Sequence, residues 1–141
     1  MTAKAATTPG QKQASAIFEA AKSFSSFSVN DLQKTKEFYG ETLGLDVKES
    51  TMGLELHTSG NTVFLYPKSN HTPASFTVLN FQVDNIDKAV DHLKQAGVTL
   101  EHYDLPDIKT DETGIARSPH GPVMAWFKDP AGNILSVVES R

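Results

Sequence analysis

Apolar residues recur along this chain with two spacings, and the same succession of spacings occurs twice. Residues 30–43 and 84–96 carry apolar side chains three or four positions apart, which is typical of amphipathic helices. Each helical segment follows one short apolar run and precedes three more, and such runs between turn residues predict strands. The pattern therefore predicts an α+β fold of two β-α-β-β-β (βαβββ) modules.

Polar residues and glycines mark where the two helices begin and end. Asn30, with Gln33 three positions later, forms a capping-box pattern, and Asp84 is the expected cap of the second helix. Gly44 and Gly97 end the helices, because glycine readily adopts the left-handed conformation of a helix terminus. The predicted strands after the helices are 45–50, 53–58, 62–66, 98–103, 122–128 and 133–138.

The modules define the expected domain organisation. Residues 1–15 are expected to be a disordered or loosely attached tail, and 16–141 a single domain. Module one covers about 22–67, a linker 68–75, and module two about 76–139. Each helix covers one face of its sheet, so the helices lie on the outside. We expect the uncovered faces to form an open, barrel-like mixed sheet around a cleft between the modules.

Composition excludes several classes of protein. The 141 residues contain 13 Lys and Arg against 17 Asp and Glu, a net charge of −4, so neither nucleic acid nor an anionic membrane is an expected partner. The absence of cysteine excludes disulfides and thiolate metal sites and fits a reducing compartment. No apolar run reaches the ~18 residues of a membrane span or has the form of a signal peptide, which predicts a cytoplasmic protein.

The order and spacing of several short motifs resemble those of the vicinal oxygen chelate superfamily. This superfamily includes glyoxalase I, bleomycin-resistance proteins, fosfomycin-resistance enzymes and extradiol dioxygenases. The resemblance runs from about Phe24 to Glu139. The motifs are Val29-Asn30-Asp31-Leu32, Phe38-Tyr39, Leu43-Gly44-Leu45, Val83-Asp84-Asn85-Ile86 and Phe127-Lys128-Asp129-Pro130-Ala131-Gly132-Asn133.

The resemblance also indicates where a metal site would lie. Metal-dependent members carry a His or Glu ligand on the first and last strand of each module. Here these positions hold Phe24, Val78, Ser136 and Leu65, or Phe64 if the turn aligns differently. Because divalent cations need imidazole or carboxylate donors, we expect neither a metal nor another cofactor.

Strand alternation predicts what the uncovered faces offer a ligand. Neutral hydrogen-bonding groups lie among aromatic side chains there, which suits a partly aromatic small molecule. In the long loop of residues 104–122, Arg117 is expected near the cleft mouth. The predicted ligand-binding residues are Phe24, Ser26, Leu65, Asn80, Gln82, His102, Arg117, Trp126 and Ser136.

Two other functions stay open at this stage. The chain could be a glyoxalase-like lyase or dioxygenase with a displaced metal site that uses Glu55, His57 or His102, or an interaction module whose uncovered face is occupied by a partner. The resemblance implies a homodimer. His71 and His92 are interpreted as solvated surface residues.

Overall fold

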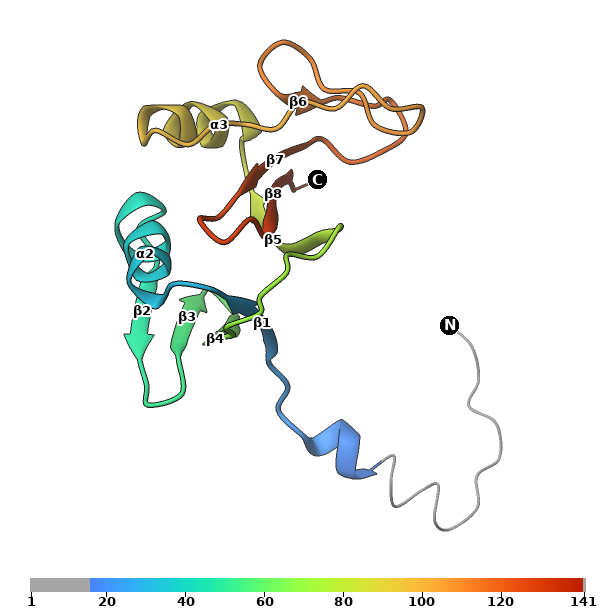
Figure 1. The fold of residues 1–141 in the computed structure, drawn as a ribbon. Helices are drawn as coiled ribbons and strands as arrows, with labels where there is room; N and C mark the ends of the chain where they lie inside the picture. The colour runs from blue at the N-terminus through green and yellow to red at the C-terminus, as the bar shows by residue number, and fades with distance from the viewer. Residues whose placement is uncertain (1–15, 141) are drawn as a thin grey trace.

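The computed structural model describes residues 16–140 and confirms an α+β fold of two modules (Figure 1). The first module contains β1 (Ser25–Val29), α2 (Leu32–Glu37), the π-helical turn η1 (Phe38–Thr42), β2 (Asp46–Glu49), β3 (Leu54–Thr58) and β4 (Asn61–Pro67). The second contains β5 (Thr77–Val83), α3 (Ile86–Gln95), β6 (Ile115–Ala116), β7 (Met124–Lys128) and β8 (Ile134–Glu139). The tail predicted at 1–15 lies outside the described residues.

Each module builds its own four-stranded mixed sheet. The strand orders are β1-β4-β3-β2 and β5-β8-β7-β6, so the first strand of each module pairs with its last. These two pairs are parallel and the remaining pairs are antiparallel. The two sheets remain separate, and no closed barrel forms.

Both helices begin one residue later than predicted. The side chain of Asp31 accepts a hydrogen bond from the backbone N–H of Lys34, and Asn85 does the same for Lys88. Each cap therefore belongs to the second polar residue of its motif rather than the first. None of the helices in residues 16–140 is long and apolar enough to span a membrane.

The strand predicted at 98–103 is wrong. Leu100 makes a single bridge to Phe127, and the short β6 occupies the sheet edge instead. The reason is a local pairing: the N–H of Thr110 donates to the carbonyl of Tyr103, and the N–H of Tyr103 donates to the Thr110 hydroxyl. This pairing turns the chain away from the sheet and raises a loop above it.

The hydrophobic core lies on one face of each sheet, which we call the covered face. Leu54, Leu56 and Leu65 from the first sheet and Leu135 from the second are almost completely buried there. Figure 1 shows α2 and α3 on the same side of the molecule, outside the sheets. The opposite face of each sheet, the open face, carries the mixed polar and aromatic residues.

Buried polar contacts join the two modules. The hydroxyl of Tyr39 on η1 donates to Oδ2 of Asp129, which lies in the β7–β8 turn, at 2.7 Å. His71, in the linker, contacts the Ser28 hydroxyl through Nδ1 at 2.6 Å and the carbonyl of Ala131 through Nε2 at 3.0 Å. The interpretation of His71 as a solvated surface residue is therefore wrong: its ring connects β1 to the β7–β8 turn.

The Tyr39 contact makes stability fall at alkaline pH. Burial, followed by the charge and hydrogen bond of Asp129, raises the pKa of the Tyr39 phenol well above its ordinary value. A raised folded-state pKa stabilises the fold below the unfolded pKa of about 10, and this contribution is lost as pH rises above it. We expect Tyr39→Phe to lower the free energy of unfolding by about 1–3 kcal/mol at pH 7 and to flatten its decline above pH 10.

Urea unfolding at pH 7 and at a series of values above pH 10 measures both effects. Tyr66→Phe is the matched control, because the Tyr66 side chain is exposed. A Tyr39→Phe protein that loses stability with alkali as steeply as the unsubstituted chain contradicts the assignment.

Candidate ligand site

The open face of the second sheet brings three of the predicted site residues into one row. In the β-sheet register Asn80 on β5 lies beside Ser136 on β8, and Ser136 lies beside Trp126 on β7. The Ser136 hydroxyl, fully buried, donates to the Asn80 amide oxygen at 2.5 Å. Gln82 lies on the same face one row further along β5. In the second module, the residues predicted to share one face of the sheet therefore do so.

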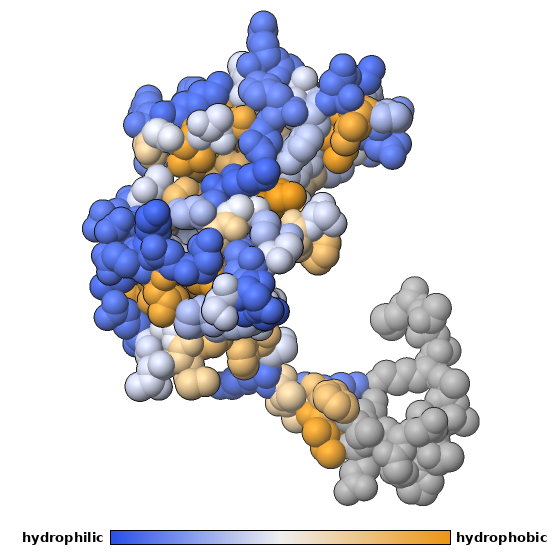
Figure 2. All heavy atoms as spheres, in the orientation of Figure 1, coloured by the Kyte–Doolittle hydropathy of each residue, from blue (hydrophilic) through white to orange (hydrophobic). Residues whose placement is uncertain are grey.

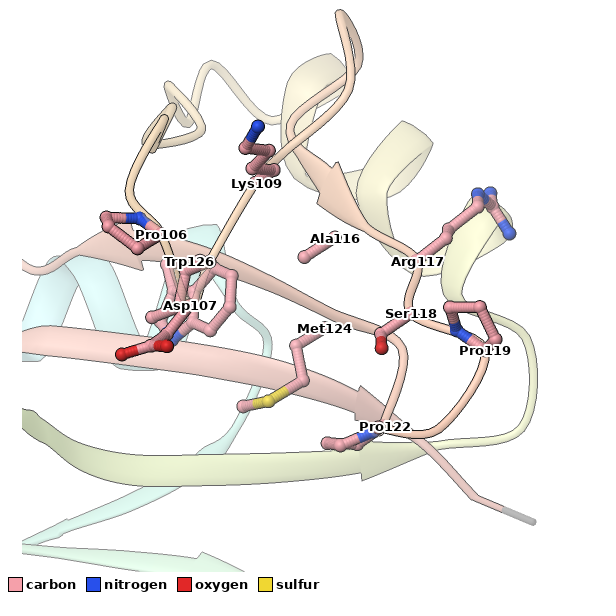
Figure 3. A pocket seen from close by; sticks show the side chains of 12 residues that line it. Pro106, Asp107, Lys109, Ala116, Arg117, Ser118, Pro119, Pro122, Met124 and Trp126 are labelled. Atoms are coloured by element: carbon pink, nitrogen blue, oxygen red, sulfur yellow. The ribbon is translucent and has the colours of Figure 1, made fainter.

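A hollow of about 410 Å³ lies over this face, between two segments of the long loop (Figure 3). Met124 and Trp126 form its floor, and prolines lie in both walls. Residues 106–109 line one side and residues 116–119, 121 and 122 the other, with Ser118 as a hydroxyl group among them. The volume is within the ~300–1,000 Å³ range of small-molecule sites.

The loop that walls the hollow is held by its own hydrogen bonds. The side chain of Asp111 accepts from the backbone N–H groups of Thr113 and Ile115, and Leu105 and Ile108 pair through their backbones. Gly114, at φ +93°, passes so close to Leu100 that an added Cβ would lie 2.9 Å from the Leu100 Cβ. The loop therefore has a defined conformation over the sheet.

The Trp126 side chain is more buried than an aromatic ring that stacks freely on a ligand. Its side chain is 7 % exposed, and the Tyr103 ring packs edge-on against it with centroids 5.4 Å apart. Partial burial, together with the charge of Glu101, raises the pKa of Tyr103, so its phenol is a neutral group beside the floor. The floor of the hollow is therefore a nearly buried indole, packed against Tyr103, together with the Met124 side chain.

Two of the three charged residues that line the hollow, Arg117 and Lys109, lie at its rim, and Asp107 is the third. The Arg117 guanidinium is 2.6 Å from an oxygen of Asp87 and 3.7 Å from one of Asp111, so its charge is compensated. The side chains of Arg117 and Lys109 point away from the floor (Figure 3). A ligand on the floor therefore meets mainly apolar and neutral groups, together with the carboxylate of Asp107 in one wall.

The open face of the first sheet differs from the prediction at one position. Leu65 is completely buried on the covered face beside Phe27, and its neighbour Phe64 occupies the open face beside Ser26. The prediction that Leu65 lies on the open face is therefore wrong. The alternative alignment of the turn, which places Phe64 there, is correct. The Phe64 ring stacks with that of Tyr66 at 6.5 Å.

Of the predicted residues, only Arg117 and Trp126 line this hollow; Asn80, Gln82 and Ser136 lie on the same face of the sheet but outside its lining. The others lie elsewhere. Phe24 is 67 % exposed immediately before β1, and His102 is exposed. Ser26 lines a second hollow of about 370 Å³ at the junction of the modules, together with Tyr66 and Phe76. The first hollow lies entirely within the second module, whereas the sequence predicted a cleft between modules.

Apart from Arg117, sequence reasoning missed the loop residues that wall the hollow. Pro106, Pro119 and Pro122 are among them, and their clustering in one loop is the only signal the sequence offered. Prolines restrict the backbone and have no N–H to donate, which suits the wall of a preformed apolar site.

The positions at which the fold would hold a metal do not fit one. Phe24, Phe64, Val78 and Ser136 provide no imidazole or carboxylate donor. Within residues 16–140, no group of three or more His, Cys, Asp or Glu side chains is arranged to hold a metal ion. Glu55 and His57 contact each other, Oε2 to Nε2 at 3.2 Å, on the open face of the first sheet.

Two βαβββ modules, each with a helix-covered face and an open face, define the class of fold to which this chain belongs. Residues 23–137 match the Glyoxalase/Bleomycin resistance protein/Dioxygenase superfamily, and the chain belongs to this superfamily.

Solved structures with the same fold have varied functions. TnmS3, an antibiotic-binding protein from Streptomyces sp. CB03234, is 25 % identical, with a TM-score of 0.61 over 86 % of this chain and 98 % of that one. Lactoylglutathione lyase from Agrobacterium tumefaciens is 20 % identical, with a TM-score of 0.62 over 86 % and 94 %. The fosfomycin resistance protein FosX from Listeria monocytogenes is 14 % identical, with a TM-score of 0.65 over 86 % and 94 %.

Proposed function

We propose that this chain is a cytoplasmic, metal-free small-molecule-binding protein of the glyoxalase and bleomycin-resistance type. The observation that carries the proposal is the 410 Å³ hollow, whose floor is Met124 and Trp126 and whose walls are rich in proline. An apolar floor with a few neutral hydrogen-bonding groups favours a partly aromatic ligand without strong charge. The likeness to the antibiotic-binding TnmS3 supports binding as the function.

The same proposal includes a homodimer. The open face of the first sheet, with the stacked Phe64 and Tyr66 and the Glu55–His57 pair, forms no part of the hollow. A two-fold dimer that sets this face opposite the second sheet of another copy encloses the ligand and buries the exposed aromatic rings. The predicted cleft between modules then becomes a cleft between chains.

Filling the hollow tests the location of the site. Ala116 lines it, and Ala116→Leu adds bulk there. Against a panel of planar aromatic small molecules, we expect this variant to bind at least about tenfold more weakly than the unsubstituted chain, as measured by isothermal titration calorimetry in the presence of EDTA. Gln95→Leu, on α3 and away from both open faces, is the matched control and should bind normally, whereas Ser26→Leu adds the same group to the junction hollow and tests that location.

Two outcomes overturn parts of this proposal. If Ser26→Leu abolishes binding and Ala116→Leu does not, the ligand lies at the module junction. If binding disappears in EDTA and returns with Zn²⁺, the displaced metal site of the lyase or dioxygenase alternative replaces the metal-free mode.

A further inference from the structure

The junction hollow contains a serine and a histidine placed as a nucleophile and its base. The Ser28 hydroxyl on β1 and Nδ1 of His71 in the linker are 2.6 Å apart. Both residues are half-buried and line this hollow of about 370 Å³. Their separation is at the short end of the ~2.6–3.2 Å expected of a serine and the base that activates it. The contact is therefore close enough for a proton to pass from the hydroxyl to the ring.

The second contact of the ring determines which nitrogen acts as the base. Nε2 of His71 lies 3.0 Å from the backbone carbonyl oxygen of Ala131. Because a carbonyl oxygen only accepts hydrogen bonds, Nε2 of the neutral ring carries the proton and donates it there. Nδ1 is then unprotonated and accepts the Ser28 hydroxyl. A hydroxyl, an imidazole and an acceptor behind the imidazole have the roles of a catalytic triad, here with a backbone carbonyl in place of the carboxylate.

The β7–β8 turn, which provides that carbonyl, also holds both members of the pair. The side-chain amide of Asn133 donates to the backbone carbonyl of Ser28 at 3.0 Å. An added Cβ on Gly132 would lie 3.2 Å from Cγ of Pro73, so the turn packs closely against the linker that carries His71. Catalytic groups need such support, because a shift of about 1 Å removes much of their effect. The pair is therefore positioned by one element of the fold.

The walls of the junction hollow indicate an uncharged substrate. Among the described residues, those that line it include no Asp, Glu, Lys or Arg, and Tyr66 and Phe76 provide aromatic surface. The side-chain hydroxyls of Tyr66 and Thr72 make no hydrogen bond within residues 16–140, so they are available as donors to an oxyanion. Figure 2 shows pale and orange tones on the linker side of the module junction, in contrast to the mostly blue surface over α2. The hollow therefore suits a small neutral ester.

We propose that Ser28 and His71 hydrolyse small uncharged carboxylic esters in the junction hollow. Oγ of Ser28 attacks the ester carbonyl carbon and its proton passes to Nδ1 of His71; the bond to the alcohol oxygen then breaks, and the alcohol leaves with that proton. Water next attacks the acyl-Ser28 ester and gives a proton to Nδ1. The acid leaves, and the proton returns to Oγ. The pair lies within one chain and outside the ligand hollow of the second module, so this activity is independent of the proposed binding and of the homodimer.

A fluorophosphonate probe and p-nitrophenyl acetate test the pair in the full-length chain. The probe forms a phosphonate ester with an activated serine and releases fluoride, and we expect mass spectrometry to find one adduct per chain, on Ser28. We also expect the chain to hydrolyse p-nitrophenyl acetate above the spontaneous rate in the presence of EDTA. Ser28→Ala should lower that rate at least about 100-fold, because it removes the nucleophile. Ser75→Ala is the matched control: it removes an exposed hydroxyl of the linker that does not line the hollow, and it should keep full activity.

His71→Asn separates the base from the structural contact. The asparagine amide can accept the Ser28 hydroxyl but cannot take its proton, so we expect hydrolysis to fall at least about 100-fold and the adduct to disappear. Thermal unfolding checks that each variant is folded, and where one is not, the adduct on the unsubstituted chain decides. An adduct on Ser28 supports the pair, whereas no adduct, or one only on another residue, overturns it. If Ser28→Ala is as active as Ser75→Ala, the proposal fails, and His71 only joins the modules. The ligand hollow of the second module is unaffected by either result.

Discussion

We expect Asp129→Ala to lower the free energy of unfolding by about 3–5 kcal/mol. One carboxylate oxygen of this buried residue accepts the backbone N–H groups of Ala131 and Asn133, at 3.0 and 2.8 Å. The other accepts the Tyr39 hydroxyl at 2.7 Å and the Asn133 side-chain amide at 3.0 Å. Alanine removes the acceptor of all four donors in a place that water does not reach, and only the Asn133 amide keeps another partner, the carbonyl of Ser28.

Urea unfolding followed by Trp126 fluorescence measures this loss. Asp31→Ala provides the comparison, because Asp31 is a helix cap whose side chain accepts one exposed backbone N–H. Its loss should be about 1 kcal/mol. If the two substitutions cost the same, Asp129 does not organise the junction of the modules in the way the hydrogen bonds indicate.

Gly53→Ala is expected to cost about 3–5 kcal/mol, because both the backbone and the space around it require glycine. Gly53 has φ +156°, and a Cβ there would lie 2.2 Å from the carbonyl oxygen of Leu65. That oxygen belongs to the backbone of a buried strand, so it cannot move aside without disturbing the pairing of β3 with β4.

Thermal and urea unfolding measure the stability that Gly53→Ala loses, and Gly60→Ala is the comparison. Gly60 also has a positive φ, of +85°, but a Cβ there meets nothing within 4 Å. Its cost should be about 1–2 kcal/mol, which is the strain of the backbone alone. Equal losses at the two positions would mean that the close approach to Leu65 is not a constraint.

The sequence predicted which residues lie on the open face more accurately in the second sheet than in the first, and the reason lies in the alternation of residues. On β5 and β8 polar residues such as Asn80 and Ser136 alternate with apolar ones, so the parity of each strand is defined. In β4 the run Val63-Phe64-Leu65-Tyr66 is apolar at every position. Hydrophobicity alone therefore does not show whether Val63 and Leu65 or Phe64 and Tyr66 face the core. Counting residues through the turn placed Leu65 on the open face instead of the covered face.

Contacts between distant parts of the chain were beyond the reach of local patterns. His71 has an ordinary loop setting in the sequence, yet its partners Ser28 and Ala131 lie 43 and 60 positions away. The hollow depends on how the loop of residues 104–122 folds over Met124 and Trp126, and no periodicity describes such a loop. The motifs defined the family and the modules, while the site depended on tertiary structure.

The pairing of first with last strand in each module determines how the chain must assemble. β8 lies between β5 and β7, so the final strand to be synthesised occupies an interior position of its sheet. Until it inserts, β5 has no hydrogen-bonding neighbour in the second sheet, and the β6–β7 pair stands alone. Closing that sheet requires pairing of residues 56 or 57 positions apart, which slows folding and leaves apolar strand edges available to aggregation in the meantime. The first module, complete by Pro67, can form its sheet earlier and present a surface on which the second module folds.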